Sequence, residues 1–182
     1  MRITAGKFKG RTLVVPALAG LRPTPAKVRQ ALFNIIPPLF PSTLDDSRML
    51  DLFSGSGIMA VEALSRGVSH VVSCEQSAKA RHSMQNMAKK LALDSSVWQW
   101  LAAPLPNGLE QFSDQHFTWV FADPPYRQGI AEKIPGWLQD YRISCDLLVI
   151  EEASDVCITW KKSHLKLSMI RRYGSTSLHF LR

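Results

Sequence analysis

The sequence is poor in the residues that bind metals or form disulfides. It has three cysteines, Cys74, Cys145 and Cys157, which are far apart, odd in number and without CxxC spacing. We therefore expect buried thiols in a reducing compartment and no disulfide framework. The five histidines show no metal-ligand spacing, so we also expect no metal.

Long apolar runs are missing as well. The segment from Val14 to Leu21 is short and is interrupted by Pro16 and Gly20, which excludes a signal-peptide core or a membrane span there. We expect a cytoplasmic protein with no membrane partner, and a monomer. The chain has 182 residues, of which 46% are hydrophobic and 20% charged, so it can bury the core of one globular domain.

Acidic residues are absent before Asp45. Seven basic residues precede it, and the remaining 15 equal the 15 acidic residues, so the net charge of +7 belongs to the first quarter of the chain. They are Arg2, Lys7, Lys9, Arg11, Arg22, Lys27 and Arg29. This segregation favours a polyanionic partner. We take the seven as candidate RNA-binding residues, although Arg22 and Arg29 could instead pair with acids of the core.

The first 44 residues are expected to form a basic extension. Residues 2–4 and 12–15 could pair across Gly6 to Gly10 as a hairpin, which suits a membrane surface less well than an amphipathic helix would. A helix begins at Pro25 and ends at Pro37 and Pro38. Residues 45–182 are expected to form the main domain.

Strands and helices alternate in this main domain. The apolar patterns predict strands near 48–53, 70–75, 97–101, 117–122 and 145–151, and helices near 56–66, 76–92, 104–113 and 128–140. Residues 165–171 and 177–181 suggest an antiparallel hairpin that turns at Gly174. The fold class is therefore α/β, with a mostly parallel seven-stranded sheet and helices on both faces.

The tetrapeptide Asp123-Pro124-Pro125-Tyr126 follows the apolar strand 117–122. Ligands bind at the carboxyl ends of strands in open α/β sheets, and two prolines hold the backbone there in one extended shape. Such a corner can offer a carboxylate oxygen and a carbonyl to a planar amine, with the Tyr126 ring stacked on its heterocycle. An ordinary proline-rich turn is the alternative.

A glycine loop, Ser54-Gly55-Ser56-Gly57, follows the first strand of the main domain. Its glycines let a ligand approach the backbone closely. Asp51 lies at the end of this strand and Glu75 at the end of the next, where a carboxylate suits the two hydroxyls of a ribose. The loop lacks the lysine of a phosphate-binding loop, so S-adenosylmethionine fits as the cofactor. The 20-residue spacing from Gly55 to Glu75 also matches a dinucleotide fingerprint, which keeps a small NAD-binding oxidoreductase open.

Beyond these two motifs, the chain resembles the bacterial small-subunit (16S) rRNA guanine-N2 methyltransferase family of RsmD type, within the Rossmann-like class I methyltransferases. The resemblance is carried by the segments Leu21-Arg22-Pro23-Thr24, Leu32-Phe33-Asn34, Leu50-Asp51-Leu52-Phe53 with Gly55-Ser56-Gly57, and Glu62-Ala63-Leu64-Ser65-Arg66-Gly67. It is roughly continuous from residue 2 to residue 127. It implies S-adenosylmethionine-dependent methylation of the N2 amine of a guanine in 16S rRNA or the small ribosomal subunit.

The resemblance also completes the candidate sites. The cofactor-binding residues are Asp51, Phe53, Gly55, Ser56, Gly57, Glu75 and Gln76, with Thr24 and Arg22 near the cofactor carboxylate or the target phosphate. The catalytic candidates are Asp123, Pro124, Pro125 and Tyr126. Relatives usually have Ala at Ser54, Gly at Ala60 and Glu at Gln30. They also have an Asp or Asn near the adenine, where this chain has Ala102 and Ala103.

We expect Asp123 and the Pro124 carbonyl to accept the two N–H groups of the target amine, because these contacts strengthen as positive charge builds on nitrogen. Asp51 faces the methionine end of the cofactor and Glu75 holds the ribose in this interpretation. A non-catalytic rRNA-binding or assembly protein with the same fold is the remaining alternative. The target base must be unstacked, as in an RNA loop.

Overall fold

The computed structural model describes residues 1–15, 24–40, 44–160 and 163–182. The chain folds as two compact units, Met1–Ala102 and Ala103–Arg182. The expected boundary after residue 44 thus falls inside the first unit. Within the described ranges, no helix has the length and apolar character needed to cross a membrane.

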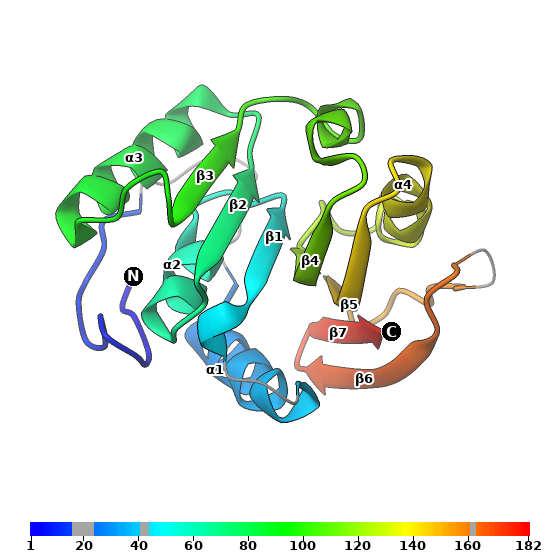
Figure 1. Cartoon of the computed structure of the whole chain (residues 1–182). Coiled ribbons are helices and arrows are strands. Elements are labelled where there is room, and N and C mark those ends of the chain that lie inside the picture. The colour runs from blue at the N-terminus through cyan, green and yellow to red at the C-terminus, as the bar shows by residue number, and fades with distance from the viewer. Residues whose placement is uncertain (16–23, 41–43, 161–162) are drawn as a thin grey trace. The chain divides into compact units, whose positions relative to one another are not determined.

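The described residues of the first unit form three parallel strands and three α-helices, which are labelled in Figure 1. The strands are β1 (Arg48–Leu52), β2 (His70–Cys74) and β3 (Trp98–Leu101), and the helices are α1 (Ala26–Ile35), α2 (Ile58–Ser65) and α3 (Ala78–Leu91). The register aligns Leu50 with Val72, and Val72 with Gln99. Strands β1 and β2 are buried after their first residue, as expected for parallel strands between helices, whereas β3 buries Trp98 and Leu101 and exposes Gln99.

The described residues of the second unit form four strands and one α-helix. They are β4 (His116–Ala122), β5 (Ser144–Ala153), β6 (Leu167–Tyr173), β7 (Thr176–Leu181) and α4 (Ile134–Asp140). Strands β4 and β5 are parallel, whereas β7 is antiparallel to both β5 and β6. Strands β6 and β7 form the C-terminal hairpin (Figure 1).

The strand order is β3-β2-β1-β4-β5-β7-β6. The mostly parallel seven-stranded sheet with a C-terminal antiparallel hairpin is therefore confirmed.

Two expected helices differ from the structure. Residues 104–113 contain only a short 3-10 helix, Asn107–Phe112, which begins after Pro106, because the residue before a proline is disfavoured in the helical conformation. Residues 128–140 are divided into a 3-10 turn, Ala131–Lys133, and α4, where Pro135 is tolerated in the first turn.

Two smaller expectations are refined near the N-terminus. The N-terminal hairpin reduces to a single β-bridge, between Arg2 and Thr12. Residues Pro37–Leu39 form a further 3-10 helix where a linker was expected.

Candidate functional site

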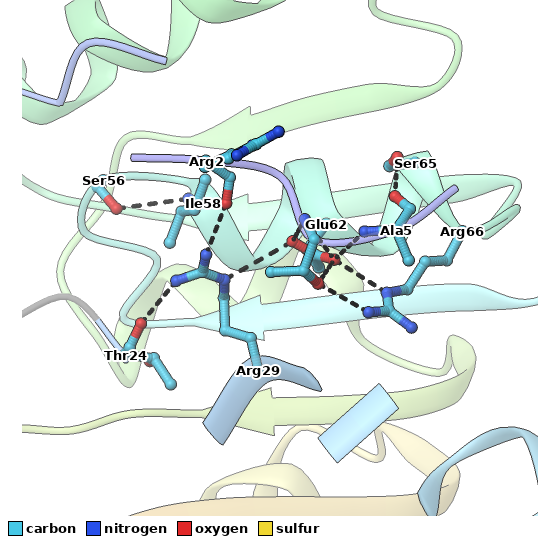
Figure 2. Close-up of polar contacts among 10 residues, drawn as sticks. Arg2, Ala5, Thr24, Arg29, Ser56, Ile58, Glu62, Ser65 and Arg66 are labelled. Carbon is cyan, nitrogen blue, oxygen red and sulfur yellow. Dashed lines mark hydrogen bonds and ion pairs between the residues drawn. The ribbon is translucent and has the colours of Figure 1, made fainter. Parts of the chain in front are cut away.

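A buried charge network attaches the N-terminal segment to helix α2 (Figure 2). The carboxylate of Glu62 is fully buried and accepts hydrogen bonds from the backbone N–H groups of Thr4 and Ala5, at 3.0 and 3.2 Å. The guanidinium of Arg66 donates to the same carboxylate at 3.0 Å. Arg29 lies 3.7 Å from it, at 1% exposure. One buried acid therefore connects the N-terminal segment, α1 and α2.

Arg29 also ties two backbone segments together. Its guanidinium donates to the carbonyl of Thr24 at 2.7 Å and to the carbonyl of Arg2 at 3.0 Å (Figure 2). Burial lowers the pKa of Arg29, and the charge of Glu62 opposes this shift. Arg29 is therefore a buried residue that pairs with Glu62. This is the alternative role stated above, pairing with an acid of the core, and not the expected contact with RNA.

Gly6 is the point of closest approach between the N-terminal segment and α2. It has φ +79°, and a Cβ atom there would lie 1.7 Å from the carbonyl oxygen of Ser65. The N–H of Lys7 donates to that oxygen at 2.7 Å, and the N–H of Phe8 donates to the Ser65 hydroxyl at 3.0 Å. Only glycine allows this close approach, so the N-terminal segment could not pack against α2 in this way with any other residue at position 6.

Most basic side chains of the N-terminal segment and α1 are exposed to solvent. Arg2, Lys7, Lys9, Arg11 and Lys27 are exposed, which is compatible with their expected role in RNA binding. The side chains of Lys7 and Arg11 lie over the ring of Phe8, at 5.1 and 5.3 Å from its centroid. Arg22 lies outside the described residues.

The glycine loop begins directly after β1 with an unusual backbone. Phe53 and Gly55 have φ values of +65° and +52°, and Gly57, at the start of α2, has +75°. A Cβ atom on Gly57 would lie 2.6 Å from the side chain of Met84 and 2.9 Å from that of Trp98. The loop therefore brings the N-terminus of α2 against α3 and β3, where only a glycine fits.

Glu75 connects the loops that follow β1 and β2. One carboxylate oxygen accepts a hydrogen bond from the N–H of Gly55 at 2.8 Å, and the other accepts from the N–H of Ser77 at 2.7 Å. Each oxygen keeps a second lone pair, so Glu75 can still accept from two hydroxyl groups. The carboxylate is thus fixed in place before any ligand arrives.

Asp51 is buried beside this pair of loops, at 1% exposure. Its Oδ2 atom has no hydrogen-bond partner among the described residues. Burial raises the pKa of Asp51 to about 8, the nearby negative charge of Glu75 adds to the rise, and the Ser54 hydroxyl opposes it. A buried acid with a vacant oxygen can receive a cationic group, such as the ammonium of an amino-acid ligand.

The other cofactor candidates differ in exposure. Thr24 and Ser56 are buried, and Phe53 is half-buried. Gln76 is exposed, and its carbonyl accepts a hydrogen bond from Arg81. Ala102 ends the first unit after β3, and neither it nor Ala103 has a polar side chain for an adenine.

In the second unit, the Asp-Pro-Pro-Tyr corner follows β4 as predicted. Asp123 and Tyr126 are half-buried, Pro124 is buried and Pro125 is exposed. The Tyr126 hydroxyl donates a hydrogen bond of 2.6 Å to the carboxylate of Glu151, on β5. Burial raises the pKa of Tyr126, with further contributions from the charges of Glu151 and Asp123. The phenol is therefore neutral and is anchored at its hydroxyl end.

Sequence reasoning missed the acids that support the corner. Glu151 and Glu152 are 1% exposed near the end of β5. Glu152 accepts from the N–H groups of Arg127 and Ala153, at 3.1 and 2.8 Å, and so holds the residue after Tyr126. The available signal was two adjacent acids at the end of an apolar strand.

The site residues therefore fall into two groups. The first unit brings together Asp51, Gly55 and Glu75, and the second unit brings together Asp123 and Tyr126 with Glu151. Among the described residues, no group of three or more potential ligands could hold a metal ion.

Known proteins with this sequence pattern include methyltransferases. The family model described as "conserved hypothetical protein 95" matches residues 1–182. The Bacillus subtilis protein YlbH is 30% identical over 182 residues, which cover 98% of this chain and 96% of YlbH. Ribosomal RNA small subunit methyltransferase D of Escherichia coli K12 is 35% identical over 157 residues, covering 86% of this chain and 75% of the relative. The solved structure of the E. coli methyltransferase yhhF superposes with a TM-score of 0.84, at 27% identity, and covers all of this chain and 96% of the other.

Proposed function

Because the chain belongs to the family described as conserved hypothetical protein 95, the RsmD type of class I S-adenosylmethionine-dependent methyltransferase, we propose that it methylates the exocyclic N2 amine of a guanine in small-subunit (16S) rRNA. The observation that carries this proposal is the Asp123-Pro124-Pro125-Tyr126 corner, with its tyrosine anchored to a buried acid. The rRNA substrate is taken from the name of the E. coli relative. The choice of guanine N2 rests on the family resemblance.

The residues of the first unit suit the cofactor. The vacant oxygen of Asp51 matches the ammonium of the methionine end, and Glu75 offers acceptors to the ribose hydroxyls. Gly55 and Gly57 keep the loop backbone bare for close approach. When bound, S-adenosylmethionine supplies an electrophilic methyl group on a sulfonium sulfur.

The residues of the second unit suit the acceptor. The lone pair of an exocyclic guanine amine is delocalised into the ring, so the amine is a weak nucleophile. Asp123 and the Pro124 carbonyl accept its two N–H bonds and fix its plane, while the ring of Tyr126 stacks on the base. Transfer of the methyl group would give this nitrogen positive charge. The charge of Asp123 stabilises this change, and the surplus proton is acidic enough to leave to solvent.

The test is methyl transfer with labelled S-adenosylmethionine to small ribosomal subunits and to 16S rRNA, both from cells that lack this protein. We expect wild-type protein to modify one guanine at N2, mapped by mass spectrometry of RNA fragments. The Asp123→Ala variant should lose methyl transfer while it retains RNA binding.

Three results would contradict the proposal in different ways. RNA binding by the wild-type protein without any methyl transfer would indicate a non-catalytic RNA-binding protein. Saturable NAD binding without S-adenosylmethionine binding would indicate an oxidoreductase. A methyl group on adenine N6 would correct the acceptor while leaving the methyltransferase in place.

A further inference from the structure

The C-terminal part of the chain carries a second concentration of positive charge. No acidic side chain follows Asp155, whereas six basic ones do: Lys161, Lys162, Lys166, Arg171, Arg172 and Arg182. Residues 45–155 therefore hold nine basic side chains against all 15 acidic ones. The equal numbers of basic and acidic residues after residue 44 thus consist of an acidic middle and a basic C-terminus.

Strand β6 displays part of this charge at the edge of the sheet. It is the last strand in the order and pairs only with β7. All six residues of β7 are buried, whereas five of the seven residues of β6 are exposed. Neighbouring residues of a strand point to opposite faces, so Arg171 and Arg172 place a guanidinium on each side of the edge. Neither arginine forms an ion pair with a described residue.

Apolar side chains accompany these charges. Leu167 is 41% exposed and Ile170 is 37% exposed, and both lie on β6. With the half-buried ring of Tyr173, they give the edge a mixed basic and apolar character. A strand of seven residues is about 20 Å long, which is enough to reach several phosphates of a nucleic-acid backbone.

We propose that the edge of β6 is a second RNA-binding surface, on which Arg171 and Arg172 contact backbone phosphates of the substrate RNA. This inference rests on the proposed function and deepens it, since it adds a contact in the second unit to those of the N-terminal extension. Guanidinium groups suit phosphate because they bind it in a bidentate manner and remain charged at all relevant pH values. The alternative is that arginines on an edge strand only prevent strand pairing between molecules. The experiment separates the two roles.

The experiment compares Arg171→Gln/Arg172→Gln with Arg171→Lys/Arg172→Lys and with Lys79→Gln/Lys89→Gln. The last pair removes the same charge from the exposed face of α3. Affinity for a 16S rRNA transcript is measured by filter binding at several salt concentrations. We expect the glutamine variant of β6 to reduce the slope of log affinity against log salt by about 1 per lost contact, hence by about 2. The lysine variant should keep most of the slope, and the α3 variant should keep all of it.

Each result decides a separate point. An unchanged slope in the glutamine variant overturns the proposal, and self-association of that variant in gel filtration would assign β6 to edge protection. Loss of binding to assembled subunits but not to the transcript would assign it to a protein partner and would also overturn the proposal. Loss of methyl transfer by Asp123→Ala is independent of these results, so the proposed function can stand while this inference fails.

Discussion

Asp51 is a buried acid whose pKa should fall when a cationic group binds beside it. Its pKa of about 8 means that the cofactor-free protein carries a proton there at neutral pH. A bound ammonium favours the carboxylate, so cofactor binding should release this proton. In the pH range below about 8, affinity for S-adenosylmethionine should then rise with pH by up to about tenfold per unit, and it should level off above that range.

Calorimetric titration in two buffers of different ionisation enthalpy measures this proton release directly. The Asp51→Asn variant is the control, because it keeps the shape of the side chain and cannot release a proton. Its binding should be weaker and should show no release from this site. Proton-neutral binding by the wild-type protein at pH 7 would show that the cofactor's ammonium lies elsewhere.

Tyr126 has a hydroxyl anchored to Glu151 and a half-buried ring, which stacks on the base in the proposed function. Tyr126→Phe removes the donor to buried Glu151, which should lower the free energy of unfolding by about 1–3 kcal/mol. Activity should stay within about tenfold of wild type, because the ring remains. Tyr126→Ala also removes base stacking, worth about 1–3 kcal/mol, and should reduce kcat/KM for RNA much further. Urea unfolding and methyl-transfer kinetics measure the two effects, and equal loss of activity in both variants would make the hydroxyl the functional group.

At the scale of elements, the N-terminal segment is attached to helix α2 by the close packing of Gly6 on Ser65 and by the hydrogen bonds of Glu62. Gly6→Ala should detach the segment, because the new methyl group would overlap the carbonyl oxygen of Ser65. Gly10→Ala is a matched control: Gly10 also has positive φ, +84°, but the nearest atom to its Cβ would be a flexible Arg2 nitrogen at 3.6 Å. The control should show only the backbone strain of about 1–2 kcal/mol.

Limited proteolysis of residues 1–15 and RNA affinity report on this docking. We expect rapid cleavage and weaker RNA binding in Gly6→Ala alone, with cofactor affinity close to wild type in both variants. Equal behaviour of the two variants would show that the segment docks without the close approach at position 6.

The elements with simple local patterns were predictable from the sequence. The strand ends at Asp51, Glu75 and Asp123 were placed correctly, because an apolar run followed by a polar residue is a local signal. The pairing of Arg29 with Glu62 joins residues 33 positions apart, so sequence alone left two roles open. Glu151 likewise supports Tyr126 only because β5 pairs with β4. Such contacts depend on tertiary packing, which no single segment encodes.

At the scale of the whole molecule, the two units divide the chemistry that we propose. The residues assigned to the cofactor lie in Met1–Ala102, and those assigned to the amine lie in Ala103–Arg182. Each unit also carries its own basic segment, at opposite ends of the chain, with the acidic residues between them. The two basic segments that we assign to RNA binding therefore belong to different units.

This arrangement predicts that the two basic segments contribute independently to binding of one RNA. We expect Arg2, Lys7, Lys9 and Arg11 changed together to glutamine to reduce the salt slope by up to about 4, and the β6 glutamine variant to reduce it by about 2. In a variant with all six changes, the two losses in log affinity should add if the two segments bind the RNA independently. Filter binding over a salt series measures the slopes, and light scattering confirms one RNA per protein. If the combined variant instead binds RNA no more weakly than the N-terminal variant, the β6 changes remove no contact that is still present. This result would show that the two segments do not bind the same RNA at the same time.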